Sequence, residues 1–504
     1  MKNYFNVVVT LMLFALSVNA EDIKPVKITS GFENVQNPDW GGDVLITSIE
    51  PLGPISGVAR SNGTIYVAIP DTTTVPGMCL LVYKSTNFGD NWTRISSAIQ
   101  GSALVTKTKM VKTGADSIYC VFLANNTLYY WNVENNSFNV HPTDVVRDYD
   151  VGITSSAVMY VTVDIATSNT IRRYATMDGG ASYSQSATIT SSGANPRVSP
   201  SATGDTIIVN YYGPILTDTS TSVIRSAIYR ETSPGTFSSS NFVNVTQAGQ
   251  PKREFFSITI GGIVMFIYVE GVPGSRDIKG YLSSNGGVSY PQTFDFMITP
   301  NVDEYWATGK ANTHAPGGFD IAYFSDSTGT PGITSDKIIH QSALITSPLS
   351  FTSGTRVTQN FPPEYSTAEY KPELIEFQNS TGDLGVIWVG VDGASKRVYW
   401  NRMTQLTNIK NNSNQLAEKF ELYQNYPNPF NPVTTIKFSI VENAYVSLKV
   451  YDMLGKEVAN PVDQQMNSGV YEYQFDASGL SSGVYYYRLQ AGENSLTRKM
   501  TVLK

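Results

Sequence analysis

The sequence predicts an all-β protein in which a seven-bladed β-propeller, or alternatively a six-bladed one, is followed by a small immunoglobulin-like β-sandwich. Three observations lead to this prediction. A hydrophobic strand recurs seven times between residues 21 and 410, and a turn motif of eight residues returns three times in step with it. Short alternating strands then fill the chain after residue 420. Repeats of short strands at regular spacing are typical of a propeller.

The composition fits a large β-rich protein and excludes several classes of function. The chain has 504 residues, a net charge of −7, 15% charged residues, 30 Tyr, 2 Cys and 3 His. An average protein carries about 25% charged residues, and a mildly acidic chain lacks the basic face that nucleic acid binding needs. So few Cys and His residues argue against a zinc site. We therefore expect no cofactor, no metal and no nucleic acid partner.

Residues 1–20 have the three-part layout of a secretory signal peptide. Lys2 supplies a positive start, an apolar stretch runs from Val7 to Val18, and small residues precede Glu21. A membrane-spanning helix needs about 20 apolar residues, and no run in the chain reaches that length. The sequence predicts that the leader is removed and that the exported protein has no transmembrane segment.

Residues 21–407 contain the repeats, and we assign them to the propeller. Each repeat has a hydrophobic strand after a turn and a further strand behind it. The hydrophobic strands begin at Thr64, Ser117, Ala157, Thr206, Ile263, Phe319 and Leu384. Division by seven gives about 56 residues per blade, which is enough for four short strands. A lone blade exposes both of its faces, so stacking blades in a ring is what buries them.

The last repeat lacks an outer strand after Arg402. We expect the segment Ile23–Ser30 to add that strand and so close the ring of blades. Pro25 is acceptable there, because an outermost strand has a free edge that needs no further donor.

Three of the repeats run into one eight-residue turn motif, at Ser85–Trp92, Thr176–Tyr183 and Ser283–Tyr290. The Asp or Asn side chain is expected to cap turn amides, the Gly to adopt a left-handed conformation, and the aromatic residue to pack back into the blade. The motif resembles the Asp-box of sialidases and other BNR-repeat propellers, although two copies have Asn for Asp and two have Tyr for Trp. The resemblance implies a structural role, on the face opposite the usual active site. The positions concerned are Ser85, Asn87, Gly89, Trp92, Thr176, Asp178, Gly180, Tyr183, Ser283, Asn285, Gly287 and Tyr290.

Candidate chemistry lies at the loops that enter the innermost strands, where much of the sparse charge is found. These entries hold Arg60, Lys107, Lys109, Asp144, Arg147, Asp148, Asp150, Arg197, Lys252, Arg253, Glu254, Asp303, Glu304, Tyr305, Glu364, Tyr365, Glu369 and Tyr370. A sialidase needs three arginines for the sugar carboxylate, a Tyr nucleophile activated by Glu, and an acid/base Asp.

The sialidase roles have candidate residues, but the fit is loose. The arginines would be Arg147, Arg197 and Arg253, with Tyr365, Glu369 and Asp148 as the other catalytic groups. The early Arg-Ile-Pro motif of sialidases is absent, and Val58-Ala59-Arg60-Ser61 does not replace it. The favoured interpretation is that these are rim charges, solvated or paired with one another.

Cys79 and Cys120 fall on strands of neighbouring blades. Export permits a disulfide between them, and two buried free thiols are the favoured alternative. A thiol count with and without reductant distinguishes the two.

The last eighty-odd residues form a separate module. A linker rich in Asn, Lys and Gln is predicted at 408–419, and Tyr426-Pro427-Asn428-Pro429-Phe430-Asn431-Pro432 forms an extended, rigid entry. Alternating strands and regular turns then predict a small β-sandwich.

Residues 420–504 resemble the type A C-terminal sorting domain of the type IX secretion system. The resemblance rests on the proline-rich entry, on Val450-Tyr451-Asp452-Met453-Leu454-Gly455, on residues 481–489 and on the closing residues 499–504. It implies a Gram-negative bacterium of the Bacteroidetes or a related group, with the secretion machinery as partner. It also implies passage through the periplasm to the cell surface or the exterior, usually with later removal of the domain.

The favoured function is therefore that of a secreted or surface-displayed, non-enzymatic module that binds a glycan or a protein at its channel face. One alternative is a glycoside hydrolase of sialidase type. Another is a structural component of a cell-surface or extracellular assembly.

Overall fold

The computed structural model describes most of the chain after the leader. The described part comprises Trp40 and residues 43–503, with gaps at 72–77, 96–98, 101–103, 115, 143, 214–222, 247–251, 272–275, 298–301, 313–317, 327–336, 345–349, 352–354, 359–362, 364–369, 378–383, 394, 404–408, 412–418, 442–443, 467–468, 478–479 and 493. The predicted signal peptide, residues 1–20, lies outside it, as does Ile23–Ser30.

The described residues form an all-β protein, as predicted, in which successive antiparallel sheets follow one another along the chain. The first sheet holds β2 (Ser56–Ala59), β3 (Ile65–Pro70), β4 (Met78–Ser85), β5 (Thr93–Arg94) and β6 (Ile99–Gln100). The second holds β7 (Val105–Lys112), β8 (Ile118–Ala124), β9 (Thr127–Asn132) and β10 (Ser137–Val140). The third holds β11 (Val146–Ile153), β12 (Met159–Ile165), β13 (Thr170–Thr176) and β14 (Gln185–Thr190).

The later sheets repeat this order. The fourth holds β15 (Ala194–Pro200), β16 (Thr206–Tyr212), β17 (Ile224–Ser233) and β18 (Thr236–Asn244). The fifth holds β19 (Lys252–Ile260), β20 (Ile263–Glu270), β21 (Asp277–Ser283) and β22 (Gln292–Met297). The sixth holds β23 (Asp303–Asn312), β24 (Gly318–Asp326), β25 (Lys337–Leu344), β26 (Ser350–Phe351) and β27 (Thr355–Arg356). The seventh holds β28 (Glu373–Glu376), β29 (Leu384–Asp392), β30 (Ser395–Met403) and β1 (Val44–Thr47).

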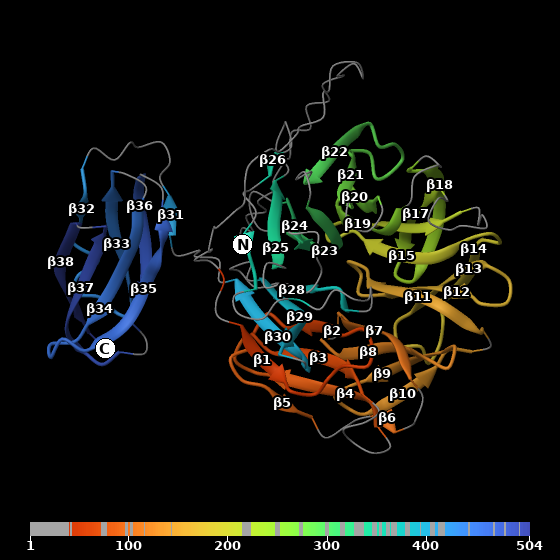
Figure 1. The fold of residues 1–504 in the computed structure, drawn as a ribbon, viewed down its shortest axis with the longest axis horizontal. Helices are drawn as coiled ribbons and strands as arrows, with labels where there is room; N and C mark the ends of the chain where they lie inside the picture. The colour runs from red at the N-terminus through yellow and green to blue at the C-terminus, as the bar shows by residue number, and fades with distance from the viewer. Residues whose placement is uncertain are drawn as a thin grey trace, which may run out of the picture.

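The first strands of these sheets form a closed ring around a common axis (Figure 1). Each packs on the first strand of the next sheet, in the order β2, β7, β11, β15, β19, β23 and β28, and β28 packs on β2. The recurring hydrophobic strands of the sequence are the second strands β3, β8, β12, β16, β20, β24 and β29. They are almost wholly buried, because each lies between two neighbouring strands of its sheet and between two neighbouring sheets.

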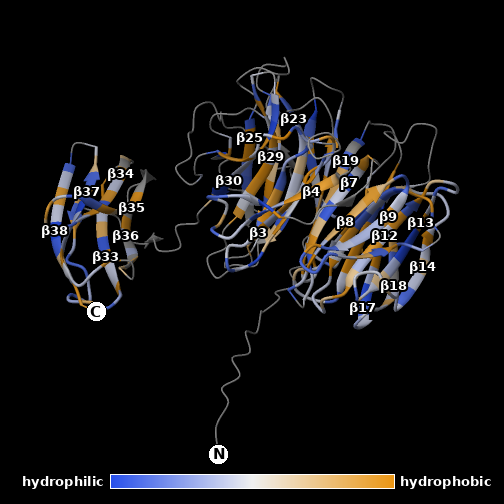
Figure 2. Ribbon diagram, turned by 90° about the horizontal axis from the view of Figure 1, so that it is seen from below, coloured by the Kyte–Doolittle hydropathy of each residue, from blue (hydrophilic) through white to orange (hydrophobic). Residues whose placement is uncertain are grey.

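Buried apolar side chains form layers between consecutive sheets rather than one central core. One layer joins the first sheet to the second, the next joins the second to the third, and another joins the third to the fourth. Figure 2 shows the apolar residues following the strands of the ring. A single sheet would expose both of its apolar faces, so the ring is the unit that removes them from water.

The seventh sheet takes its outer strand from the N-terminal part of the chain, but not from the predicted segment. The strand that pairs with β30 is β1, with Val44 opposite Trp400 and Leu45 opposite Tyr399. The prediction for Ile23–Ser30 is therefore wrong as to the residues. The strand Val44–Thr47 is only four residues long and does not alternate between apolar and polar residues. It therefore gives no periodic signal in the sequence, and this is why it was not recognised.

The three turn motifs adopt one geometry. In the first, Gly89 N donates to Ser85 Oγ at 2.9 Å, and Asn91 N donates to Asn87 Oδ1 at 3.1 Å. The second and third repeat both hydrogen bonds at 2.9–3.0 Å with Thr176 and Asp178, and with Ser283 and Asn285. Either Asp or Asn can occupy the third position of the motif, because the turn needs only one side-chain oxygen as hydrogen-bond acceptor.

The glycine of each turn rests on the preceding sheet of the ring. Gly89, Gly180 and Gly287 have φ values of +96°, +86° and +85°. A Cβ at Gly89 would meet the indole of Trp400, and one at Gly180 would meet the ring of Tyr130. Trp92 also packs edge-on against Trp400, with 6.0 Å between ring centroids. The motif therefore joins neighbouring sheets, whereas the sequence predicted packing within a blade.

The C-terminal residues form two facing four-stranded sheets. One holds β31 (Ile409–Asn411), β36 (Gly469–Asp476), β33 (Val433–Ile440) and β32 (Glu421–Leu422). The other holds β35 (Glu457–Met466), β34 (Ala444–Tyr451), β37 (Gly483–Ala491) and β38 (Asn494–Val502). Because β31 pairs with β36, part of the predicted linker 408–419 belongs to this sandwich.

The proline-rich entry and the end of the chain lie side by side in this sandwich. Asn428 Oδ1 accepts a hydrogen bond from Thr501 N at 2.8 Å, and Phe430 N donates to Thr501 O at 3.1 Å. Leu503 N donates back to Phe430 O at 2.9 Å. The two ends of the segment that carries the sorting-domain resemblance thus form one structural unit.

Candidate functional site

Charged side chains of the innermost strands converge on the axis of the ring. Lys107, Asp148, Arg197 and Glu254 lie near the ends at which the chain enters these strands, whereas Lys310 and Glu376 lie near the other ends of β23 and β28. In each antiparallel sheet the entry end lies opposite the turn between the third and fourth strands, so the entry-end charges and the Asp-box-like turns are on opposite faces. We call this set the channel cluster; it consists of Lys107, Lys109, Asp148, Asp150, Arg197, Glu254, Lys310, Lys371, Glu373 and Glu376.

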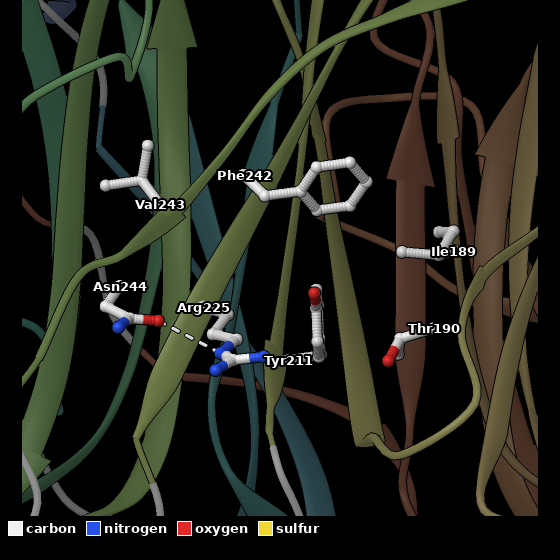
Figure 3. A pocket seen from close by; sticks show the side chains of 7 residues that line it. All are labelled: Ile189, Thr190, Tyr211, Arg225, Phe242, Val243 and Asn244. Atoms are coloured by element: carbon white, nitrogen blue, oxygen red, sulfur yellow. Dashed lines mark hydrogen bonds between the residues drawn. The ribbon is translucent and has the colours of Figure 1, made fainter.

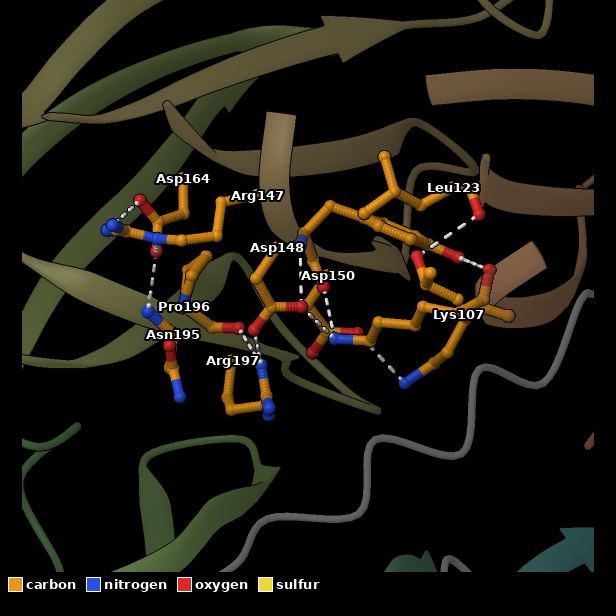
Figure 4. A network of polar contacts seen from close by, with 12 residues as sticks. Lys107, Leu123, Arg147, Asp148, Asp150, Asp164, Asn195, Pro196 and Arg197 are labelled. Carbon is orange, nitrogen blue, oxygen red and sulfur yellow. Dashed lines mark hydrogen bonds and ion pairs between the residues drawn. The ribbon is translucent and has the colours of Figure 1, made fainter. Parts of the chain in front are cut away.

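The centre of the channel cluster is an ion triplet (Figure 4). Lys107 Nζ lies 2.6 Å from Asp148 Oδ1, and Arg197 Nη1 lies 2.8 Å from Asp148 Oδ2. Burial alone would raise the pKa of Asp148, but Arg197 and Lys107 hold it well below its usual range. Burial and the charge of Arg197 lower the pKa of Lys107 to about 8. The shared carboxylate is therefore what keeps two neighbouring cations together.

Other carboxylates of the cluster link adjacent innermost strands through ion pairs and hydrogen bonds. Asp150 lies 3.1 Å from Lys109 Nζ, and its Oδ2 accepts a hydrogen bond from Val198 N at 2.8 Å. Glu373 Oε2 accepts one from Gly57 N at 2.9 Å, across the junction of the seventh and first sheets. An innermost strand has no sheet partner on its axial side, so these side chains satisfy backbone donors that would otherwise face the channel.

Two further carboxyl groups titrate near neutrality. Burial raises the pKa of Glu254 to about 7, against the opposing effects of Lys371 and Arg276. Burial likewise raises the pKa of Glu376 to about 7, against Lys310. The side chain of Lys371 is exposed, but neighbouring residues reduce the hydration of its ammonium group, and this desolvation and the charge of Arg197 lower its pKa. The cluster is thus reached by solvent and mixes both signs of charge.

A β-bulge precedes the channel residues in several innermost strands. The register shifts between Val105 and Lys107, between Val146 and Asp148, between Ala194 and Arg197, and between Lys252 and Glu254. A bulge adds a residue to one strand and re-aims the side chains that follow. The repetition of this irregularity explains why a charge from each of these strands reaches the axis.

A bulge also separates two of the three arginines assigned to a sialidase-type clamp, Arg147 and Arg197. Arg147 is itself a bulge residue, and its guanidinium bonds Asp164 at 2.8 Å and Asn169 at 3.0 Å instead of joining Arg197. Arg197 follows its bulge and binds Asp148. Arg253 occupies the bulge of β19, and its side chain lies outside the described residues. Tyr365 and Glu369 also lie outside them.

Two further entry charges, Arg60 and Asp303, form ion pairs outside the channel cluster. Arg60 lies 2.9 Å from Asp116 and 2.8 Å from Glu134. Arg276 forms an ion pair with Asp303, and its guanidinium carbon lies 3.7 Å from the centre of the Tyr305 ring.

Sequence reasoning missed four members of the cluster: Lys310, Lys371, Glu373 and Glu376. The signal for Lys371 and Glu373 was charge at every second residue, as in Lys107 and Lys109 or Asp148 and Asp150, whereas Lys310 and Glu376 belong to no such pair. In a strand this spacing places both side chains on one face, and an innermost strand has one face toward the channel.

A second polar group is buried between the second and third sheets. His141 Nδ1 lies 3.3 Å from Tyr130 Oη and 3.2 Å from Tyr183 Oη, and its Nε2 lies 3.3 Å from Asp144 Oδ2. Asp144 also bonds Tyr174 and Arg172. The aromatic residue of the second turn motif thus covers a buried histidine.

His141 is expected to make the ring less stable in mild acid. Burial lowers its pKa, against the effect of Asp144 and with a further lowering by Arg172. The unfolded chain therefore binds the extra proton first, and stability falls as the pH drops below about 6.5, the unfolded value. Denaturant unfolding at about pH 7.5 and about pH 5 measures this loss. A His141→Gln variant should lose less stability between the two pH values than the unmodified protein; an equal loss would contradict the assignment.

Cys79 and Cys120 are both free and buried, in the apolar layer between the first and second sheets. The structure therefore has the two buried free thiols that the sequence analysis favoured over a disulfide. Burial raises the pKa of each thiol, so both remain protonated within their apolar surroundings.

Two features are absent from the described residues. These residues contain no group of three or more His, Cys, Asp or Glu placed to hold a metal ion. Within the part of the chain that the structure covers, no helix is long and apolar enough to span a membrane.

One family model matches the chain: residues 424–503 match the secretion system C-terminal sorting domain. This confirms the type IX sorting domain predicted from the sequence, and it indicates secretion to the cell surface or the extracellular space. No curated protein matches the chain.

Several solved structures are similar to this chain at low identity. A fungal alcohol oxidase of the AA5 family, in complex with copper, is 9% identical with a TM-score of 0.47, over 92% of this chain and 99% of that chain. A GH43 β-1,3-galactosidase is 12% identical with a TM-score of 0.31, over 72% and 92%. A subtype N10 neuraminidase-like protein of A/little yellow-shouldered bat/Guatemala is 11% identical with a TM-score of 0.35, over 60% and 94%. Such likenesses do not identify what this chain binds.

Proposed function

We propose that the protein is an exported, non-enzymatic binding module that holds an extracellular glycan or protein at the channel face of its ring. In this proposal residues 1–20 are a removable leader, residues 21–407 are the binding propeller, and residues 420–504 direct export. The observation that carries the proposal is the channel cluster, a set of partly exposed charged groups brought together from several sheets. A surface of mixed charge suits polar ligands, which it recognises by complementary pairing.

The ion pairs within the cluster favour binding over sialidase-type hydrolysis. A carboxylate clamp needs arginines that are free to bind the substrate, whereas Arg197 already binds Asp148 and Arg147 already binds Asp164. One observation favours the hydrolase as a second candidate. Glu254, with a pKa of about 7, would be partly protonated at neutral pH, as a general acid must be.

A ligand screen with two matched charge reversals tests the proposal. The secreted protein is applied to glycan and extracellular-protein arrays, and each hit is measured again with Lys371→Glu and with Arg94→Glu. Arg94 is an exposed residue of the outer strand β5, so both variants change the net charge equally. We expect Lys371→Glu to weaken binding about tenfold or more and Arg94→Glu to leave it unchanged.

Two outcomes of this screen would refute the proposal. Equal effects of the two variants would place the ligand away from the channel. Release of new reducing ends from a bound glycan, lost in Glu254→Gln, would make the protein a glycoside hydrolase.

A further inference from the structure

A second site lies on the outer wall of the ring, away from the channel. A groove of about 420 Å³ separates the end of β14 from the face of the fourth sheet. Its lining comes from β14, β16, β17 and β18 and consists of Ile189, Thr190, Tyr211, Arg225, Phe242, Val243 and Asn244 (Figure 3). The volume falls within the range of small-ligand sites, which is about 300–1,000 Å³.

The floor of the groove is built from two cross-strand rows of the fourth sheet. Tyr211 lies opposite Arg225, which lies opposite Asn244. In the adjoining row, Ala227 lies opposite Phe242. Arg225 Nε donates to Asn244 Oδ1 at 2.9 Å, which fixes the guanidinium and leaves the Asn244 amide nitrogen for a ligand.

Arg225 carries a charge that no carboxylate in the described part of the chain neutralises by an ion pair. Other arginines of the ring, such as Arg147, Arg172 and Arg197, each have such a carboxylate. The neighbouring phenol of Tyr211 stays neutral, because burial raises its pKa. The floor of the groove therefore presents the positively charged guanidinium of Arg225 in a fixed orientation. A planar carboxylate is complementary to a guanidinium in geometry and in charge.

Phe242 supplies an apolar platform beside this charge. Its side chain is 55% exposed, although it lies on the face of the fourth sheet that packs toward the third. The reason is that β14 ends at Thr190 and does not cover it. The face of an aromatic ring is electron-rich and attracts the weakly positive C–H groups of a sugar ring.

We propose that this groove binds an acidic saccharide. The sugar ring lies on Phe242, its carboxylate pairs with the guanidinium of Arg225, and its hydroxyl groups bond the Thr190 hydroxyl and the Asn244 amide. A ring face, one unpaired cation and neutral hydrogen-bonding groups match a uronic acid residue in each respect. An extended acidic peptide fits less well, because its backbone would seek the free edge of β18 rather than the short floor.

Titration calorimetry of the secreted protein tests the proposal. The probes are a uronic acid oligosaccharide and the same oligosaccharide with its carboxyl groups reduced to alcohols. We expect the acidic form to bind about tenfold or more tightly, since only it can pair with Arg225. Phe242→Ala and Arg225→Gln should each weaken its binding about tenfold, and Phe242→Trp should retain it.

Phe138→Ala is the matched control. Phe138 is also a half-exposed aromatic residue on the outer strand of a sheet, where it stacks on Trp131 with 5.8 Å between centroids. Its removal should leave binding unchanged. The proposal is overturned if the reduced oligosaccharide binds as well as the acidic one, if neither binds, if an acidic peptide displaces the saccharide more effectively, or if Phe242→Ala has no effect.

Discussion

Replacement of Gly89 by alanine is expected to destabilise the ring by about 3–5 kcal/mol, the sum of a left-handed backbone conformation and overpacking. Gly89 has a φ of +96°, and its Cα faces the indole of Trp400. Trp400 is 1% exposed, and its Nε1 donates to Phe88 O at 3.2 Å, so the indole cannot move aside without breaking that bond. The substitution therefore acts at the contact between the first and seventh sheets.

Gly286→Ala is the control for this prediction. Gly286 lies in the third turn motif with a φ of +71°, but a Cβ there would meet nothing within 4 Å. It should cost only the backbone strain, about 1 kcal/mol. Denaturant unfolding of both variants measures the difference, and equal losses would show that contact with the preceding sheet contributes little.

Removal of the Asp148 carboxylate should cost about 2–4 kcal/mol, because it leaves two cations close together without their shared partner. The range is reduced for the partial exposure of Lys107 and Arg197, whose side chains are 23% and 27% exposed. Asp148→Ala measures this cost in denaturant unfolding. The pKa of Lys107, already lowered to about 8, should fall further without that carboxylate.

A surface ion pair provides the comparison for Asp148. Arg230 and Asp205 are 53% and 50% exposed and lie 3.6 Å apart. Asp205→Ala should change stability by less than about 1 kcal/mol, as is usual for exposed pairs. If Asp148→Ala cost no more than Asp205→Ala, the channel cluster would be a collection of solvated charges.

The strands of the ring were predictable because each repeat buries a hydrophobic strand, and burial on both faces leaves a continuous apolar run. The C-terminal sandwich was predictable from alternation and from its proline-rich entry. What the sequence did not reveal are features set by contacts distant in the chain. β1 pairs with β30 because the outer edge of β30 has unpaired backbone groups, and no local pattern in Val44–Thr47 indicates this pairing.

The candidate site was predictable only in part. The charge was expected in the loops that enter the innermost strands, whereas Lys107, Asp148 and Arg197 lie within those strands, where their side chains meet. The direction of Arg147 was not foreseeable, because a single-residue bulge turns it toward Asp164. Nor was the pairing of Glu373 with Gly57 N, since it depends on how the ring closes.

The pairing of β1 with β30 also decides when the protein can finish folding. The two strands are separated by about 350 residues, and bringing such distant segments together costs about 5 kcal/mol of chain entropy. A chain still emerging from the ribosome contains Val44–Thr47 long before β30 has been synthesised. The pairing of β1 with β30 cannot form until Met403 has emerged. The seventh sheet, and with it the ring, is therefore completed only after the other sheets of the ring have been synthesised. Tension applied to the N-terminus of the finished protein would peel away this four-residue strand first.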